Sequence, residues 1–220
     1  MTETRRTGFG ELGIVFDDRV LRPRPWTTAQ SYWAADLLRH GPAGDVLELC
    51  AGVGHIGLLA VAGTSRRLVL VDIDETACRF ARTNARAVRP DGPCEVRQGR
   101  LEEVLCADER FAGIIADPPW VPSDGTGRFP DDPLGAIDGG PDGMDVAWAC
   151  VDVAARHLAD QGWLLLQLGT VGQADAVRER LAASPEPALT VLEVRDYEGQ
   201  GVLVHLAARL GTDRSRPRDP

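Results

Sequence analysis

The sequence predicts an α/β fold with a seven-stranded, mostly parallel sheet whose last strand is antiparallel. From residue 45 onward, short apolar runs alternate with longer segments of helical character, as in a parallel sheet covered on both faces. The last two apolar runs are separated by residues 196–200 alone, too few for a crossover helix, so the final strand must reverse direction. A length of 220 residues, with 44% hydrophobic and 26% charged residues, is typical of one globular domain.

Two shorter elements are predicted before this alternation. Residues 12–16 and 19–21 are extended in character and flank Asp17-Asp18, which predicts a small hairpin. Residues 28–39 have helical character and are followed by Gly41-Pro42, a helix stop signal. The regular α/β part therefore begins after residue 40.

The regular part contains seven predicted strands and five predicted helices. Each strand is a short run rich in Val, Leu and Ile, which indicates burial on both faces. The strands are expected at 45–49, 68–71, 93–97, 111–116, 162–168, 189–195 and 201–208. The helices are expected at 55–62, 75–88, 101–105, 146–158 and 174–183. A loop rich in Gly, Pro and Asp covers 118–143, and a charged, Pro-bearing disordered tail is expected at 211–220.

The charged residues exclude several classes of enzyme. All 24 basic residues are arginines, and with 33 acidic residues the net charge is −9. Without lysine there is no P-loop lysine for a nucleoside triphosphate, no Schiff-base lysine and no lysine general base. The acidic balance also makes nucleic acid an unexpected partner, because phosphate binding requires clustered positive charge.

The cysteines and the first residues predict a cytoplasmic protein without a metal centre. The five cysteines form no C-x-x-C pair and no metal-ligand spacing, which indicates reduced thiols. Residues 1–7 are polar, and no apolar run is long enough for a signal peptide or a membrane span. We therefore expect no metal and no membrane partner, and the sequence predicts no oligomeric state.

A glycine-rich turn follows the first strand of the predicted sheet. Residues 46–57 read V-L-E-L-C-A-G-V-G-H-I-G, with Glu48 near the strand end and Gly52 and Gly54 in the turn. Glycine is needed where the backbone approaches a ligand closely or takes positive φ. The next strand ends at Asp72, an acid placed to bind a ribose diol. A tight turn without a ligand and a nicotinamide site are the alternatives; Asp74 is expected to cap the following helix.

The fourth strand runs directly into Asp117-Pro118-Pro119-Trp120. The prolines remove backbone donors and fix the chain direction, which leaves carbonyls at the sheet edge. An acidic acceptor, stiff carbonyls and an aromatic ring suit a small or planar nitrogen group. The alternative is structural, with Asp117 capping a turn and Trp120 filling the core.

These strings resemble the class I S-adenosylmethionine (SAM) methyltransferases, a Rossmann-like fold, and more closely the HemK/PrmC family of protein-glutamine N5-methyltransferases. In addition to the glycine turn, five segments resemble the family, and they follow the same order along the chain. They are V-L-R-P-R-P-W-T (20–27), D-I-D-E-T-A-C-R-F-A-R-T-N-A (72–85), D-P-P-W (117–120), A-I-D-G-G-P-D-G-M-D (136–145) and G-W-L-L-L-Q-L-G (162–169).

The resemblance implies SAM as the cofactor and assigns the site residues. Cofactor contacts are implied for Thr27, Glu48, Cys50, Ala51, Gly52, Gly54, Asp72, Ile73 and Asp117. Catalytic roles are implied for Asp117, Pro118, Pro119 and Trp120, and acceptor contacts for Trp26, Trp120, Asp138, Gly139 and Gly140. Residues 1–40 are expected to cover the cofactor site of a methyltransferase domain at 41–210, with loop 118–143 as the lid.

Three departures from the family pattern bear on the acceptor. The family's N-P-P-Y is D-P-P-W here, its first loop glycine is Cys50, and the helical N-terminal domain of the release-factor enzymes is not expected. An ionised Asp117 accepts hydrogen bonds only, which favours an amine, a guanidine or an exocyclic amino group. The sequence therefore predicts an N-methyltransferase for a small molecule, with a protein glutamine side chain as the alternative.

Other classes stay open beside these two. A SAM-binding module without catalysis fits the same motifs. Adenine methylation of nucleic acid also uses D-P-P-(Y/W), but the negative charge counts against it. A short-chain NAD(P) oxidoreductase requires a Tyr and Lys pair, and the chain has no Lys.

Overall fold

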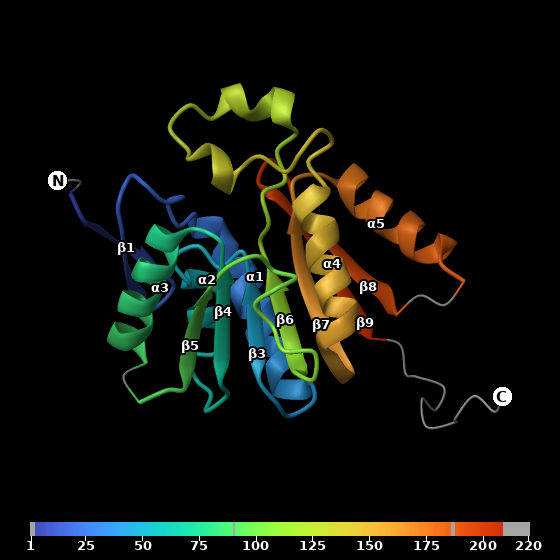
Figure 1. Ribbon diagram of the computed structural model, residues 1–220, viewed down its shortest axis with the longest axis horizontal. Helices are drawn as coiled ribbons and strands as arrows, with labels where there is room; N and C mark the ends of the chain where they lie inside the picture. Colours follow the sequence, from blue (N-terminus) through green and yellow to red (C-terminus); the bar gives the residue numbers. More distant parts are fainter. Residues whose placement is uncertain (1–2, 90, 186–187, 209–220) are drawn as a thin grey trace.

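A computed structural model of the chain describes residues 3–89, 91–185 and 188–208. Its main feature is a seven-stranded sheet of order β5-β4-β3-β6-β7-β9-β8 (Figure 1). The predicted tail at 211–220 lies outside the described residues. The strands are β3 (Val46–Leu49), β4 (Leu68–Asp72), β5 (Cys94–Gln98), β6 (Phe111–Ala116), β7 (Leu158–Leu168), β8 (Leu189–Tyr197) and β9 (Gly201–Ala208).

The direction of the strands confirms the predicted topology. β5, β4, β3, β6 and β7 are mutually parallel, and β9 pairs antiparallel with both β7 and β8. The last strand in the chain therefore lies between β7 and β8 rather than at the edge. The carboxyl ends of the five parallel strands meet at one edge, where open α/β sheets bind ligands.

Helices cover both faces of the sheet because strand side chains alternate between two apolar layers. Residues such as Val46 and Ile115 pack in the layer with α1, α2 and α3. Their neighbours Leu47 and Ile114 pack in the layer with α4 and α5 on the opposite face. The helices are α1 (Thr28–His40), α2 (His55–Ala60), α3 (Glu75–Val88), α4 (Asp145–His157) and α5 (Val171–Ala183).

The N-terminal hairpin differs from the prediction. β1 (Arg5–Phe9) pairs antiparallel with β2 (Leu12–Phe16), and Gly10 takes φ +54° in the turn between them. Residues 19–21 form no strand. The Asp17 carboxylate instead accepts hydrogen bonds from the Arg19 backbone N–H and guanidinium, which closes a local turn.

The predicted helix at 101–105 is also wrong, because this short segment forms only turns. The loop between β6 and α4 projects beyond the sheet edge and contains two short 3₁₀ helices, at Ser123–Arg128 and Leu134–Ala136 (Figure 1). Among the described residues, no helix has both the length and the apolarity to cross a bilayer.

Candidate active site

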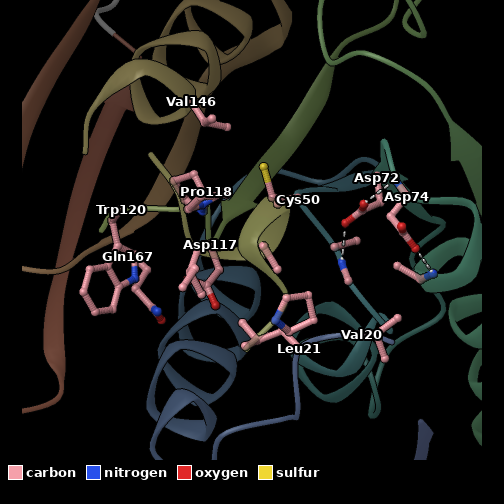
Figure 2. A pocket seen from close by; sticks show the side chains of 18 of the residues that line it. Val20, Leu21, Cys50, Asp72, Asp74, Asp117, Pro118, Trp120, Val146 and Gln167 are labelled. Carbon is pink, nitrogen blue, oxygen red and sulfur yellow. Dashed lines mark hydrogen bonds between the residues drawn. The ribbon is translucent and has the colours of Figure 1, made fainter. Parts of the chain in front are cut away.

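A cavity of about 740 Å³ lies at the carboxyl edge of the sheet. Its walls come from the turns after β3, β4 and β6, the end of β7, residues 19–27 and the loop between β6 and α4. This volume falls in the range of small-molecule sites. Figure 2 shows Asp117, Pro118, Trp120 and Gln167 grouped at one end, Asp72 and Asp74 at the other, and Cys50 between them.

The glycine turn after β3 lies against this cavity. Gly52 takes φ +53°, and a Cβ there would meet no atom within 4 Å, so its backbone faces open space. Gly54 takes φ +79° below the turn, where a Cβ would lie 2.9 Å from Leu70 Cδ1. Cys50 also takes positive φ, +54°, a conformation that favours glycine. Cys50, Ala51 and Gly52 line the cavity, but Gly54 does not.

Asp72 holds the turn from the end of β4. Its Oδ2 accepts the Gly52 N–H at 2.7 Å, and its Oδ1 accepts the Asp74 N–H at 2.9 Å. Burial is the largest influence on its pKa and raises it, although both backbone hydrogen bonds act in the opposite direction. Ile73 lies beside it at the cavity rim with 63% of its surface exposed. Asp74 caps α3 by accepting the Ala77 N–H at 2.7 Å, as predicted.

Glu48 lies beneath the turn rather than in the cavity wall. It is 1% exposed, and its Oε2 accepts the Gly57 N–H of α2 at 3.0 Å. Burial raises the pKa of this carboxyl well above its usual range. Its side chain therefore supports the start of α2 on the α1–α3 side of the sheet. His55 lines the cavity, but burial lowers its pKa to about 3 and its ring packs edge-on against Phe9 at 4.7 Å.

The segment after β6 forms the other end of the cavity. The Asp117 carboxylate lines the wall, and none of the side-chain hydrogen bonds found among the described residues involves it. Burial raises its pKa to about 7, and the Arg24 charge acts against this increase. Burial therefore favours the neutral carboxyl group at this position, whereas the sequence predicts an ionised Asp117.

Trp120 is fixed by the segment after β7. A Cβ on Gly169 would lie 2.2 Å from Trp120 Cε3, so the indole ring occupies the space that glycine leaves. The Trp120 carbonyl accepts a hydrogen bond from Gln173 Nε2 at 2.9 Å. Gln173 also completes a capping box with Thr170 at the start of α5. The geometry of the D-P-P-W turn thus depends on α5.

Part of the N-terminal segment lines the cavity, and an ion pair joins it to the loop. Arg24 pairs with the Asp132 carboxylate, and both residues belong to the cavity wall. Thr27 is buried in the wall, and its Oγ1 donates to the Arg24 carbonyl at 2.9 Å. Trp26 also lines the wall and packs on Gly201, where a Cβ would lie 2.7 Å from its ring.

Asp138, Gly139 and Gly140 do not line this cavity. They border a smaller depression that shares Gly135, Asp145 and Val146 with the wall of the cavity. Asp138 Oδ1 accepts the Ser123 hydroxyl at 2.7 Å and the Gly140 N–H at 2.9 Å, so its side chain closes a turn of the loop. Gly139 packs behind the D-P-P-W turn, where a Cβ would lie 2.6 Å from the Pro119 carbonyl oxygen. These three residues therefore shape the loop without forming part of the cavity wall.

Sequence reasoning missed Gln167, which lines the cavity at the end of β7. An apolar strand that ends in one glutamine looks like an ordinary core strand. The only available signal in the sequence was the position of Gln167 near the end of a predicted strand of the parallel sheet. No cluster of His, Cys, Asp or Glu suited to a metal is present among the described residues.

The chain is similar to known methyltransferases. The family model "Methyltransferase small domain" matches residues 32–128. The ribosomal protein uL3 glutamine methyltransferase of Bradyrhizobium diazoefficiens is 32% identical over 86% of this chain and 61% of its own length. The release factor glutamine methyltransferase of Pseudomonas aeruginosa is 36% identical over 80% of this chain and 64% of its own. The chain thus spans about three fifths of the length of these relatives.

The likeness to solved structures concerns the fold. The hMettl16 catalytic domain, in complex with the MAT2A 3′UTR hairpin 6, superposes with a TM-score of 0.70. It is 16% identical in sequence, and the match covers 94% of this chain and 78% of that one.

Proposed function

We propose that this chain, which resembles the HemK/PrmC family of class I SAM-dependent methyltransferases, methylates the side-chain amide nitrogen of a glutamine residue in a protein. The relatives named for release factor and ribosomal protein substrates support this acceptor. They favour it over the small-molecule acceptor that D-P-P-W first suggested. The observation that carries the proposal is the position of the Asp117 carboxyl group in the same cavity as Gly52 and Asp72.

The residues on the β4 side fit SAM. Gly52 leaves open space where a side chain would block a ligand, and both Asp72 oxygens retain lone pairs for ribose hydroxyls beside their backbone hydrogen bonds. Acidic groups at both ends of the cavity suit a cationic sulfonium. When bound, SAM supplies an electrophilic methyl group on sulfur. Gly52, Cys50, Ala51 and Asp72 would hold it.

The residues on the β6 side fit an amide. A carboxyl oxygen of Asp117 accepts an amide N–H as the asparagine oxygen of N-P-P-Y does, so an acid at this position does not exclude glutamine. Asp117 and the Pro118 carbonyl accept the two N–H groups of the amide and orient its nitrogen. Trp120 packs on the acceptor and excludes water.

Asp117 can also act as the proton acceptor of the reaction. The nitrogen that accepts a methyl group must lose one proton, and an ionised Asp117 with a pKa near 7 can take it. Methyl transfer should therefore slow as the pH falls below about 7.

The test is transfer of isotopically labelled methyl from SAM into an extract that is then separated into protein, nucleic-acid and small-molecule fractions. We expect label in protein, with peptide mass spectrometry locating it on glutamine. Asp117→Ala should reduce turnover at least a hundredfold while SAM affinity changes less than threefold. Label confined to small amines would restore the small-molecule acceptor, and label confined to nucleic acid would overturn both. Binding of SAM without any transfer would indicate a non-catalytic module.

A further inference from the structure

The Gln167 and Asp117 side chains leave neighbouring strands at the same level. β6 and β7 are parallel and in register up to the pair Ala116 and Leu166. The next residue on each strand is Asp117 and Gln167, so successive positions bring the two side chains to one face of the sheet edge. Figure 2 shows both at the end of the cavity that also holds Trp120.

The amide of Gln167 has no partner within the described residues. Its side chain is almost fully enclosed, with 3% of its surface exposed, yet it lines the cavity. Oε1 is buried without a hydrogen bond. Buried amides normally have partners, because an unsatisfied one costs free energy. The N–H side of the same amide also makes no hydrogen bond within the described residues, and a molecule bound in the cavity can accept one from it.

The nearby strand carbonyls are already satisfied, so they do not compete for the Gln167 amide. Gln30 of α1 reaches under the sheet edge, and its Nε2 donates to the Ala116 carbonyl at 3.0 Å and the Leu165 carbonyl at 3.1 Å. This bridge also fixes the spacing of β6 and β7 where Asp117 and Gln167 begin. Gln30 therefore acts as a positioning residue for the pair.

We infer that Gln167 and Asp117 together recognise a primary carboxamide and that Gln167 determines specificity for this group. Because Oε1 is turned into the protein, the amide presents N–H to the cavity, whereas Asp117 presents an acceptor. A carboxamide matches this pair with one carbonyl oxygen and one N–H. An ammonium or guanidinium offers donors only and meets the Gln167 N–H with no acceptor. The inference rests on the proposed glutamine acceptor and adds the residue that selects it.

Two substitutions at one position test the inference, in the full chain saturated with S-adenosylhomocysteine. Gln167→Leu removes the donor, and Gln167→Glu replaces it with a group that accepts. The probes are N-acetylglutamine methylamide and n-butylamine, titrated by saturation-transfer NMR. We expect the wild type to prefer the carboxamide, and both variants to bind it at least tenfold more weakly. Gln167→Glu should instead prefer the amine.

Two controls separate recognition from folding. Gln200→Leu changes a glutamine that also lines the cavity, in the turn before β9, and should leave carboxamide binding within twofold. S-adenosylhomocysteine affinity should stay within twofold in all variants, which confirms a folded cofactor site. Unchanged carboxamide binding in Gln167→Leu, or a wild type that prefers the amine, would overturn the inference.

The inference and the proposed function can fail separately. Label on protein glutamine with unchanged kcat/KM in Gln167→Leu would contradict the role of Gln167 and leave the function standing. Label on a small molecule with a carboxamide would contradict the protein acceptor and support the role of Gln167. Label on an amine would overturn both.

Discussion

Two carboxylates, Asp72 and Asp117, face one cavity under different constraints. Asp72 accepts two backbone N–H bonds that favour its charged form, although burial acts against it. Asp117 has only the distant Arg24 charge to offset burial, and its pKa reaches about 7. The environment thus separates an acid held by backbone N–H groups from an acid whose pKa lies near 7, as in enzymes that separate the pKa values of paired acids.

Asp72→Asn should weaken SAM binding by about 10- to 100-fold, because hydrogen bonds to a charged group contribute roughly 1.5–3 kcal/mol. The variant loses charge toward the ribose and one acceptor for the Gly52 N–H. Isothermal titration with S-adenosylhomocysteine measures the change. Asp74→Asn removes the same charge two residues away and keeps the helix cap, so it should change affinity less than threefold. Equal losses in both variants would mean that net charge alone matters.

Asp117→Asn should stabilise the protein above pH 7 and not near pH 4. The folded pKa of Asp117 is raised, so between about pH 4 and 7 the native state holds a proton that the unfolded state has released. Stability therefore falls as the pH rises through this window, and the amide avoids that loss. Urea unfolding at several pH values should show a gain of roughly 2–4 kcal/mol at pH 8. A gain independent of pH would exclude Asp117 ionisation as its source.

At the scale of elements, the parallel core was predictable and the short connections were not. β3, β4, β6 and β7 carry continuous apolar runs whose burial on both faces leaves little choice of structure. The hairpin prediction failed because Asp17-Asp18 resembles a turn, whereas the side chain of Asp17 actually binds Arg19. The predicted helix at 101–105 is too short for its own hydrogen bonds to stabilise it.

The same division applies to the site. Asp72 and Asp117 could be located because they follow predicted strands directly, and the topology brings strand ends together. Glu48 does not line the cavity and accepts the Gly57 N–H beneath the turn, and Asp138 turns inward to its own loop. The direction in which these side chains point depends on how they pack in the fold, and the spacing of residues in the sequence does not reveal it. Gln167 could be recognised only once its neighbour across the strands was known.

Gly169→Ala should impair catalysis through the position of Trp120. The added methyl would lie 2.2 Å from the indole ring, so the ring or the D-P-P-W turn must move. We expect at least a tenfold fall in kcat with cofactor affinity nearly unchanged, since small displacements of positioning groups cost large rate factors. Gly172→Ala is the matched control, because its nearest atom lies 3.8 Å away at the start of α5. A normal kcat in Gly169→Ala would show that catalysis does not depend on the position of the Trp120 ring.

Across the whole molecule, arginine performs structural work for which lysine is poorly suited. Arg89 is 8% exposed and donates to the carbonyls of Val61, Thr64 and Arg66. Its planar group presents several donors in fixed directions, whereas an ammonium is a compact point charge. The chain therefore lacks lysine for catalysis, but its arginines still connect buried backbone carbonyls, as Arg89 does. The remaining negative charge is consistent with a cavity that holds acids at both ends.

The cavity joins parts of the chain that are far apart in sequence, so cofactor binding should stabilise the whole domain. S-adenosylhomocysteine at 100 times its Kd should add about 2.7 kcal/mol to the free energy of unfolding. For a domain of this size the Tm should rise by roughly 5–10 °C. Differential scanning calorimetry at two ligand concentrations measures the shift, which must grow with concentration if the ligand binds only the native state.

Arg24→Gln should reduce this stabilisation modestly, because it breaks the ion pair with Asp132 that closes the N-terminal segment against the loop. Arg24 is 45% exposed and Asp132 19%, and partly exposed pairs contribute about 1 kcal/mol or less, so the Kd should rise about two- to fivefold. The dissociation rate should carry most of that change, since the pair holds the cover closed. Arg39→Gln breaks an exposed pair with Asp36 on α1, outside the cavity wall, and should leave dissociation unchanged. Equal dissociation rates in both variants would mean that the segment and the loop do not act as a joint cover.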